Sequence, residues 1–148
     1  MNNWFECKVS YEKTLENGLM KKVTEPYVVD AMSYAEAEER ITREMQPYMS
    51  GEFTISGIKE VNYNEIFFNN NASADYWFKC KVSFITLDER TGTGKRSNSN
   101  VLVQAVGLRE AIKYLDEQMK GTIMDYVIAS VSETKIVDAY LYKPNDQN

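Results

Sequence analysis

The stretch Trp4-Phe5-Glu6-Cys7-Lys8-Val9-Ser10-Tyr11 returns later in the chain as Trp77-Phe78-Lys79-Cys80-Lys81-Val82-Ser83-Phe84, with six of eight positions identical. Two further stretches correspond in the same order, 27–31 with 101–105 and 53–55 with 126–128. These correspondences predict a tandem duplication within a single domain that spans residues 1–148. Its parts are repeat one (1–68), a linker (69–74), repeat two (75–142) and a frayed polar tail (143–148).

The strands of repeat one follow from its local pattern. Apolar side chains occupy every second position of the opening stretch, as expected for an antiparallel strand with one buried face. Glu16-Asn17-Gly18 predicts a tight turn into a second strand from Leu19 to Ala31. Pro26 cannot donate a backbone hydrogen bond, so that part of the strand should lie at an edge, a bulge or a bend. Residues 51–68 form a third strand region, in which Gly57 marks a bulge or a break.

Each repeat also contains one predicted helix. Ser33-Tyr34-Ala35-Glu36 is a capping box, which predicts a helix start at this point. The second helix is predicted over 108–120, with Gly121 as its C-terminal cap. The repeat unit is therefore strand, strand, helix, strand, and the predicted fold is α+β: one pseudo-twofold domain with two helices packed on an antiparallel or mixed sheet. The shared core is expected to contain Phe5, Cys7, Val9, Ile41, Phe78, Cys80, Val82 and Leu115.

Composition argues against most catalytic classes. The 148 residues include no histidine, which removes His-based zinc sites and the commonest general base. Cys7 and Cys80 occupy equivalent positions and are expected to be buried, reduced side chains. The acidic residues of the first helix are expected to form a solvated face. We therefore expect no enzyme activity, no metal and no cofactor.

The sequence also gives expectations about location. No apolar run approaches the roughly 20 residues of a membrane-spanning helix. Met1-Asn2-Asn3 leads directly into the first strand without a basic and apolar leader, so no signal peptide is expected. These features predict a cytoplasmic protein without a membrane partner.

Several segments resemble an uncharacterised family. They are Trp4 to Tyr11, Lys21 to Ala31, Gly51-Glu52-Phe53, Glu65-Ile66-Phe67 and Met119-Lys120-Gly121-Thr122. Together they are similar to a domain-of-unknown-function family of small acidic proteins from Bacteroidetes bacteria and their phages. The resemblance implies a small intracellular protein, encoded by a phage or another mobile element. It carries no catalytic or binding residue with it.

The first functional hypothesis is a non-enzymatic protein that binds single-stranded nucleic acid. Trp77, Lys79 and Lys81 share one strand, where an aromatic plane can stack a base and lysines can hold phosphates. A basic hairpin tip would add a second contact. The net charge of −5 is unfavourable, but residues 1–74 carry all of the excess acid. The complete candidate site is Trp77, Lys79, Lys81, Arg90, Lys95 and Arg96, echoed more weakly by Trp4 and Lys8.

The alternative hypothesis is a protein-interaction module. Trp4 and Trp77 would then fill a second core layer or a homodimer interface, with the lysine stems lying over them. The partner would be a second copy of the chain or a host protein that this protein inhibits. Buried tryptophan is the commoner case, so the sequence favours core or interface over a stacking platform.

Overall fold

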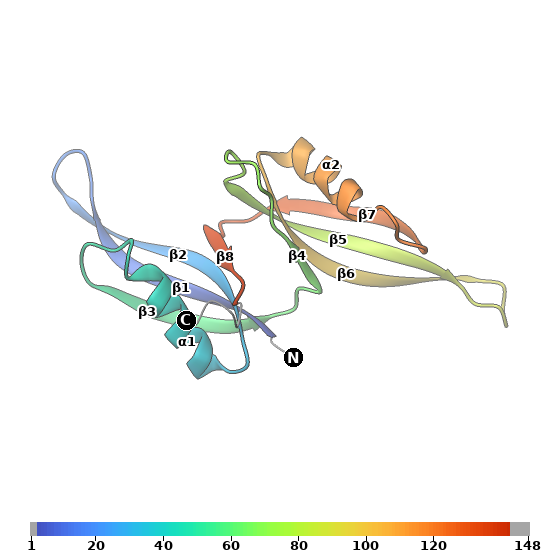
Figure 1. The fold of residues 1–148 in the computed structure, drawn as a ribbon, viewed down its shortest axis with the longest axis horizontal. Helices are drawn as coiled ribbons and strands as arrows, with labels where there is room; N and C mark the ends of the chain where they lie inside the picture. Colours follow the sequence, from blue (N-terminus) through green and yellow to red (C-terminus); the bar gives the residue numbers. More distant parts are fainter. Residues whose placement is uncertain (1–2, 143–148) are drawn as a thin grey trace. The chain divides into compact units, whose positions relative to one another are not determined.

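A computed structural model of the chain describes residues 3–142 and divides into two compact units (Figure 1). Unit 1 consists of the chain up to Asn62 together with the chain from Lys135 onward, and unit 2 is the continuous segment Tyr63–Thr134. The predicted α+β class is confirmed, with one helix on a mixed sheet in each unit. The expected single sheet is not found, because the strands form two separate four-stranded sheets.

Unit 1 is a sheet in the order β3-β1-β2-β8, with α1 over one face. The long strands β1 (Asn3–Thr14), β2 (Met20–Ala31) and β3 (Phe53–Val61) are antiparallel neighbours, and α1 spans Tyr34–Met45. The fourth strand, β8 (Asp138–Tyr140), comes from near the end of the chain and lies parallel to β2. Unit 1 is therefore completed by residues distant from it in sequence.

Unit 2 has the corresponding sheet, in the order β4-β6-β5-β7. The long strands β5 (Tyr76–Leu87), β6 (Gly94–Ala105) and β7 (Asp125–Glu133) are again antiparallel, and α2 spans Leu108–Gln118. The short strand β4 (Glu65–Phe67) lies parallel to β6. Each sheet also has a β-bulge at the equivalent place. In unit 1, β3 has one extra residue opposite Lys8 and Val9 of β1; in unit 2, β7 has one extra residue opposite Lys81 and Val82 of β5.

Local signals placed the turns and helix ends correctly. Gly18 turns the first hairpin with a φ of 84°, a conformation that glycine adopts without strain. The Glu36 backbone N–H donates to the Ser33 hydroxyl at 3.1 Å, which confirms the predicted cap. Gly121, just after α2, has a φ of 90° as expected for a helix C-terminus.

The eight predicted core residues are all buried, but they form two cores. Phe5, Cys7, Val9 and Ile41 belong to the cluster between α1 and its sheet. The other four belong to the equivalent cluster under α2: Phe78, Cys80, Val82 and Leu115. The expectation of one shared core is therefore wrong. Each helix covers its own sheet and buries its own apolar face.

Three further sequence expectations are resolved. Pro26 lies where β2 has β1 on one side and β8 has not yet begun on the other, so the edge interpretation is confirmed. The region 51–68 both contains a bulge and breaks into β3 and β4. The basic hairpin tip is short, because β5 ends at Leu87 and β6 already begins at Gly94. The predicted tail 143–148 lies outside the described residues.

Candidate functional site

The candidate site is the face of the unit 2 sheet that points away from α2. Alternation along β5 places Phe78, Cys80 and Val82 under the helix and sends Lys79 and Lys81 to the opposite face. Lys79 lies between Leu102 of β6 and Ser132 of β7, and Lys81 lies between Asn100 and Ser130. We call this surface the lysine face: Lys79, Lys81, Asn98, Asn100, Ser130 and Ser132.

The lysine face carries positive charge without compensation from neighbouring acids. Both lysine side chains are exposed, and neither forms an ion pair with any residue of the described range 3–142. Their lateral neighbours are hydroxyl, amide or apolar side chains. The arrangement suits an anion, because charge-assisted donors are flanked by neutral groups that can also form hydrogen bonds.

The corresponding face of unit 1 has different electrostatics. Glu6 occupies the position that Lys79 occupies in unit 2, and its carboxylate lies 3.5 Å from the Lys59 ammonium. Lys8 is exposed like Lys81, but its stem passes over Gly57 at the bulged edge. At the two positions that correspond to Lys79 and Lys81, unit 1 therefore has one acid and one lysine, whereas the lysine face has two lysines.

The structure removes Trp77 from the candidate site. Its side chain is 1% exposed, and the Phe68 ring packs edge-on against it with 5.5 Å between centroids. A buried indole presents no plane to a nucleic-acid base, so the predicted stacking platform at this residue is wrong. The sequence had favoured burial of the tryptophans, and for Trp77 that interpretation is confirmed.

The predicted linker is held in place by Gln104, the strand neighbour of Trp77. Gln104 lies opposite Trp77 on the neighbouring strand. Its side-chain oxygen accepts from the Asn69 backbone N–H at 2.9 Å, and its amide donates to the Ala74 carbonyl oxygen at 3.0 Å. The segment 69–74 is therefore an ordered part of unit 2. No local sequence signal identified this arrangement, because an Asn-rich run has no period.

The remaining predicted site residues are dispersed. Trp4 is half-buried in unit 1, opposite Asp30. Arg96 pairs with Ile85 and therefore shares the lysine face, whereas Lys95 pairs with Thr86 and lies on the other face. Arg90 lies in the hairpin turn, where its backbone N–H donates to the Asp88 carboxylate. The structure thus places Lys79, Lys81 and Arg96 on one face of the unit 2 sheet, Lys95 on the other face and Arg90 in the hairpin turn, whereas Trp4 and Lys8 belong to unit 1.

Hairpin charge does not distinguish the two units. Residues 12–22 carry three Lys/Arg and two Asp/Glu, and residues 87–97 carry the same numbers. Over these segments the second hairpin therefore has no excess of basic residues over the first. The distinguishing charge is the exchange of Glu6 for Lys79. The serines of the lysine face were overlooked, although the alternation Ser130-Val131-Ser132 indicates a polar strand face.

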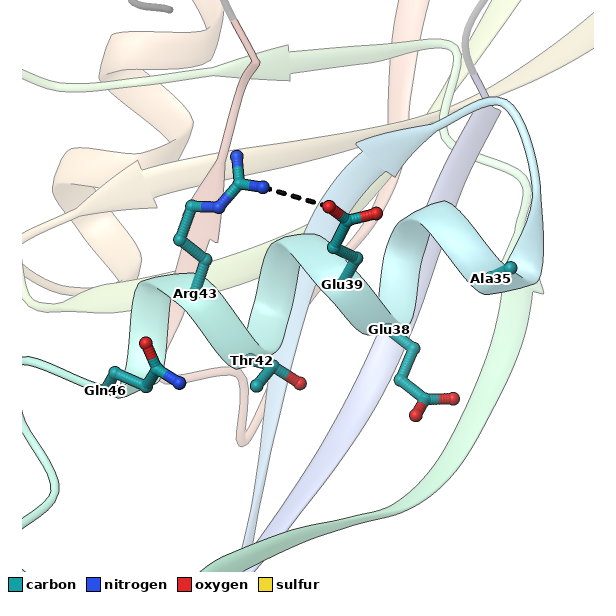
Figure 2. A pocket seen from close by; sticks show the side chains of 6 residues that line it. All are labelled: Ala35, Glu38, Glu39, Thr42, Arg43 and Gln46. Atoms are coloured by element: carbon teal, nitrogen blue, oxygen red, sulfur yellow. Dashed lines mark hydrogen bonds and ion pairs between the residues drawn. The ribbon is translucent and has the colours of Figure 1, made fainter.

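Figure 2 shows a hollow on the outer surface of α1, lined by Ala35, Glu38, Glu39, Thr42, Arg43 and Gln46. Arg43 and Glu39 form an ion pair at 3.0 Å across one helical turn, with both side chains about two-thirds exposed. The predicted solvated helix face is observed here. A carboxylate that acts as a general acid or base needs a more shielded setting than this one.

The two cysteines are buried thiols rather than nucleophiles. Burial raises the pKa of Cys7 to about 12, with a smaller contribution from the nearby Glu6 charge. Burial alone raises the pKa of Cys80 to about 11. Because the thiolate is the reactive species, both side chains are held in their unreactive form at neutral pH.

Two further features bear on function. Within residues 3–142, no cluster of three or more His, Cys, Asp or Glu side chains could hold a metal ion. Neither described helix has the length and apolar character needed to cross a membrane. The fold and the candidate surface together define a two-unit α+β protein with one basic sheet face.

Comparison with known sequences shows which family the chain belongs to. The chain belongs to the domain of unknown function family DUF4494, whose sequence pattern matches residues 3–142. The resemblance to an uncharacterised family is therefore confirmed. No curated protein and no solved structure matches the chain.

Proposed function

We propose that this protein is a non-catalytic binding module whose lysine face holds an extended anionic polymer, namely single-stranded nucleic acid. The observation that carries the proposal is the pair Lys79 and Lys81, exposed and side by side on β5 without an acidic partner among residues 3–142, in a chain of net charge −5. Positive charge left uncompensated on an acidic protein is a candidate for recognition.

The binding mode differs from the one that the sequence predicted. With Trp77 buried, affinity comes from contacts between lysines and phosphates and from hydrogen bonds of Asn98, Asn100 and the serines, and base stacking is absent. Binding of this kind has little sequence preference and weakens steeply with salt. We also propose that the protein is cytoplasmic and comes from Bacteroidetes bacteria or their phages.

The test is fluorescence anisotropy of a labelled oligonucleotide at several salt concentrations. Lys79→Glu with Lys81→Glu should reduce affinity and lower the salt slope by about 0.7 for each phosphate that the protein no longer neutralises. Lys8→Glu is the matched control for Lys81→Glu measured alone, because Lys8 stands at the position of Lys81 in the other unit, and it should have little effect. Circular dichroism confirms that each variant is folded. Equal reductions of affinity in both single variants, or no binding by the wild type, would refute the proposal.

A converse substitution probes the same idea. Glu6→Lys removes the partner of Lys59 and adds a third lysine to this face of unit 1, beside Lys8 and Lys59. Binding should strengthen and its salt slope should steepen. Unchanged affinity would show that charge at this position of the sheet does not control binding.

We also propose that the two halves arose by tandem duplication. The proposal is supported by the near-identical opening stretches, by the equal lengths of corresponding strands and by the bulge at the same point of both sheets. The substitution of Glu6 by Lys79 then marks a divergence of function after duplication.

A second candidate function is protein interaction, and it rests on β7. This strand is an open edge of its sheet, and its seven residues 126–132 carry no charge. Such an edge can accept a strand from another chain. Val127→Lys should abolish self-association detected by light scattering, whereas Val127→Thr should not. A wild type that stays monomeric at all concentrations would exclude the homodimer form of this candidate.

A further inference from the structure

The strand β8 completes unit 1 through a small set of contacts. It contributes three residues of parallel pairing, and the Val137 backbone N–H donates to the Pro26 carbonyl oxygen at 2.9 Å. On the helix side of the sheet, the rings of Tyr140 and Tyr27 stack with 6.3 Å between centroids. On the other side, Ala139 lies beside Val28, and both side chains are buried.

Contacts among Asp30, Glu36, Arg40 and Tyr142, which we call the latch, hold the end of β8. The Tyr142 backbone N–H donates to the buried Asp30 carboxylate at 2.6 Å, and the Arg40 guanidinium lies 3.9 Å above the centre of the Tyr142 ring. Arg40 also donates to the Asp30 carbonyl oxygen and pairs with the carboxylates of Asp30 at 3.4 Å and Glu36 at 2.6 Å. The latch therefore joins β8 to the end of β2 and to α1.

In unit 2, β4 is held at the corresponding place, by a neutral amide and a tyrosine hydroxyl instead of charged side chains. Gln104 stands at the end of β6, as Asp30 stands at the end of β2, and its side chain accepts from the N–H of Asn69, two residues beyond β4. The Tyr114 hydroxyl of α2 donates to the Phe68 carbonyl oxygen. In both units, a short parallel strand is thus held by polar contacts near the end of the long strand beside it.

We propose that β8 is an exchangeable strand, so that the β8 of a second copy of this chain can dock on β2 and form a strand-swapped dimer. Every contact described above for β8 lies between unit 1 and the segment 137–142. The same contacts form whether that segment belongs to the same chain or to another. The equilibrium is then set by protein concentration and by the connection 134–137, which is neither helix nor strand.

Two features favour exchange of β8 over exchange of β4. In the described part of the chain, no helix or strand follows β8, so it can leave its site without unthreading another element. By contrast, β4 is fixed between β3 and β5. An empty β2 edge would expose Val28 and leave the Asp30 carboxylate without the Tyr142 N–H. Because of this cost, a molecule whose own β8 has left β2 should bind the β8 of a nearby chain.

A disulfide reports which chain supplies the strand. Val28 and Ala139 are directly paired across neighbouring strands, within the range of separations that a disulfide bridges. The double variant Val28→Cys with Ala139→Cys is partly unfolded in urea, refolded at several protein concentrations and then oxidised. Oxidation follows refolding, when Cys7 and Cys80 are buried again.

Exchange predicts disulfide-linked dimers on a non-reducing gel, and their fraction should rise with the concentration at refolding. Disulfides confined to single chains at every concentration would overturn the proposal, as would a dimer whose disulfides are all intrachain. Should the variant fail to fold, wild-type chains labelled with ¹⁴N and ¹⁵N are refolded together and analysed by native mass spectrometry. A mixed-isotope dimer that forms only after joint refolding supports exchange, and its absence refutes it.

Discussion

Arg40→Met should destabilise unit 1 more than any other substitution of an exposed or half-exposed charge in that unit. Arg40 is the cation beside Asp30, whose residue is only 4% exposed. Removing one partner of a buried ion pair commonly costs about 3–5 kcal/mol, because the other charge stays buried. Asp30 retains the Tyr142 N–H, and its distance to Arg40 is a long 3.4 Å. We therefore expect a loss of about 2–3 kcal/mol, which includes the interaction with the Tyr142 ring.

The assay is urea unfolding followed by tryptophan fluorescence. The chain holds one tryptophan in each unit, so a Trp77→Phe background leaves Trp4 as the reporter of unit 1. Arg43→Met is the control, because its ion pair with Glu39 is exposed and should contribute only about 0.3–0.5 kcal/mol.

A double-mutant cycle separates charge from packing. Combining Arg40→Met with Asp30→Asn removes both charges, while the asparagine oxygen can still accept from Tyr142. The combined loss of stability should be smaller than the sum of the single losses by at least about 1 kcal/mol. If Arg40→Met is no more harmful than Arg43→Met, or if the cycle is additive, the ion pair is not what stabilises the latch.

Three further predictions concern the pH dependence of stability, the segment 69–74 and the unfolding transition. Burial raises the pKa of Asp138 above 3.8, and the hydrogen bond from the Ala139 N–H partly opposes this shift. Ionised Asp138 therefore lowers the stability of unit 1 at neutral pH, and this loss of stability decreases as the pH falls toward 4. Asp138→Asn should therefore stabilise unit 1 at pH 7 more than at pH 4, and a gain independent of pH would contradict this. Gln104→Ala should cost about 1–3 kcal/mol and shift Trp77 emission to longer wavelength, whereas unchanged emission would show that the segment 69–74 is held otherwise. Variants that retain only Trp4 or only Trp77 should unfold at different urea concentrations, because each unit has its own core, and a common midpoint would contradict this.

Local chemistry was sufficient to predict most of the elements. Asn17-Gly18 and the Ser33 cap define a turn and a helix start within four residues each, and the alternation in β1 and β5 identifies the buried faces. The number of sheets was not predictable in this way. A three-residue strand such as β4 or β8 has no detectable period, and its partner is chosen by contacts distant in sequence.

The candidate site shows the same division. The exchange of Glu6 for Lys79 is visible in the sequence and remains the strongest functional clue. The sequence favoured burial of Trp77 but did not identify the residues around it, namely the Phe68 ring and the strand neighbour Gln104. The ion pair between Lys59 and Glu6 likewise requires the register of β3 against β1.

Because β8 follows unit 2 in the sequence, the two units become complete at different times during synthesis. Unit 2 is continuous, so all of its strands have been translated once Thr134 has been added. Unit 1 begins first but remains one strand short until residues 138–140 emerge from the ribosome. A premature stop codon at position 135 would leave unit 2 with every residue and deprive unit 1 of its fourth strand. The amino-terminal half of this protein would thus be damaged by losing the carboxyl-terminal end.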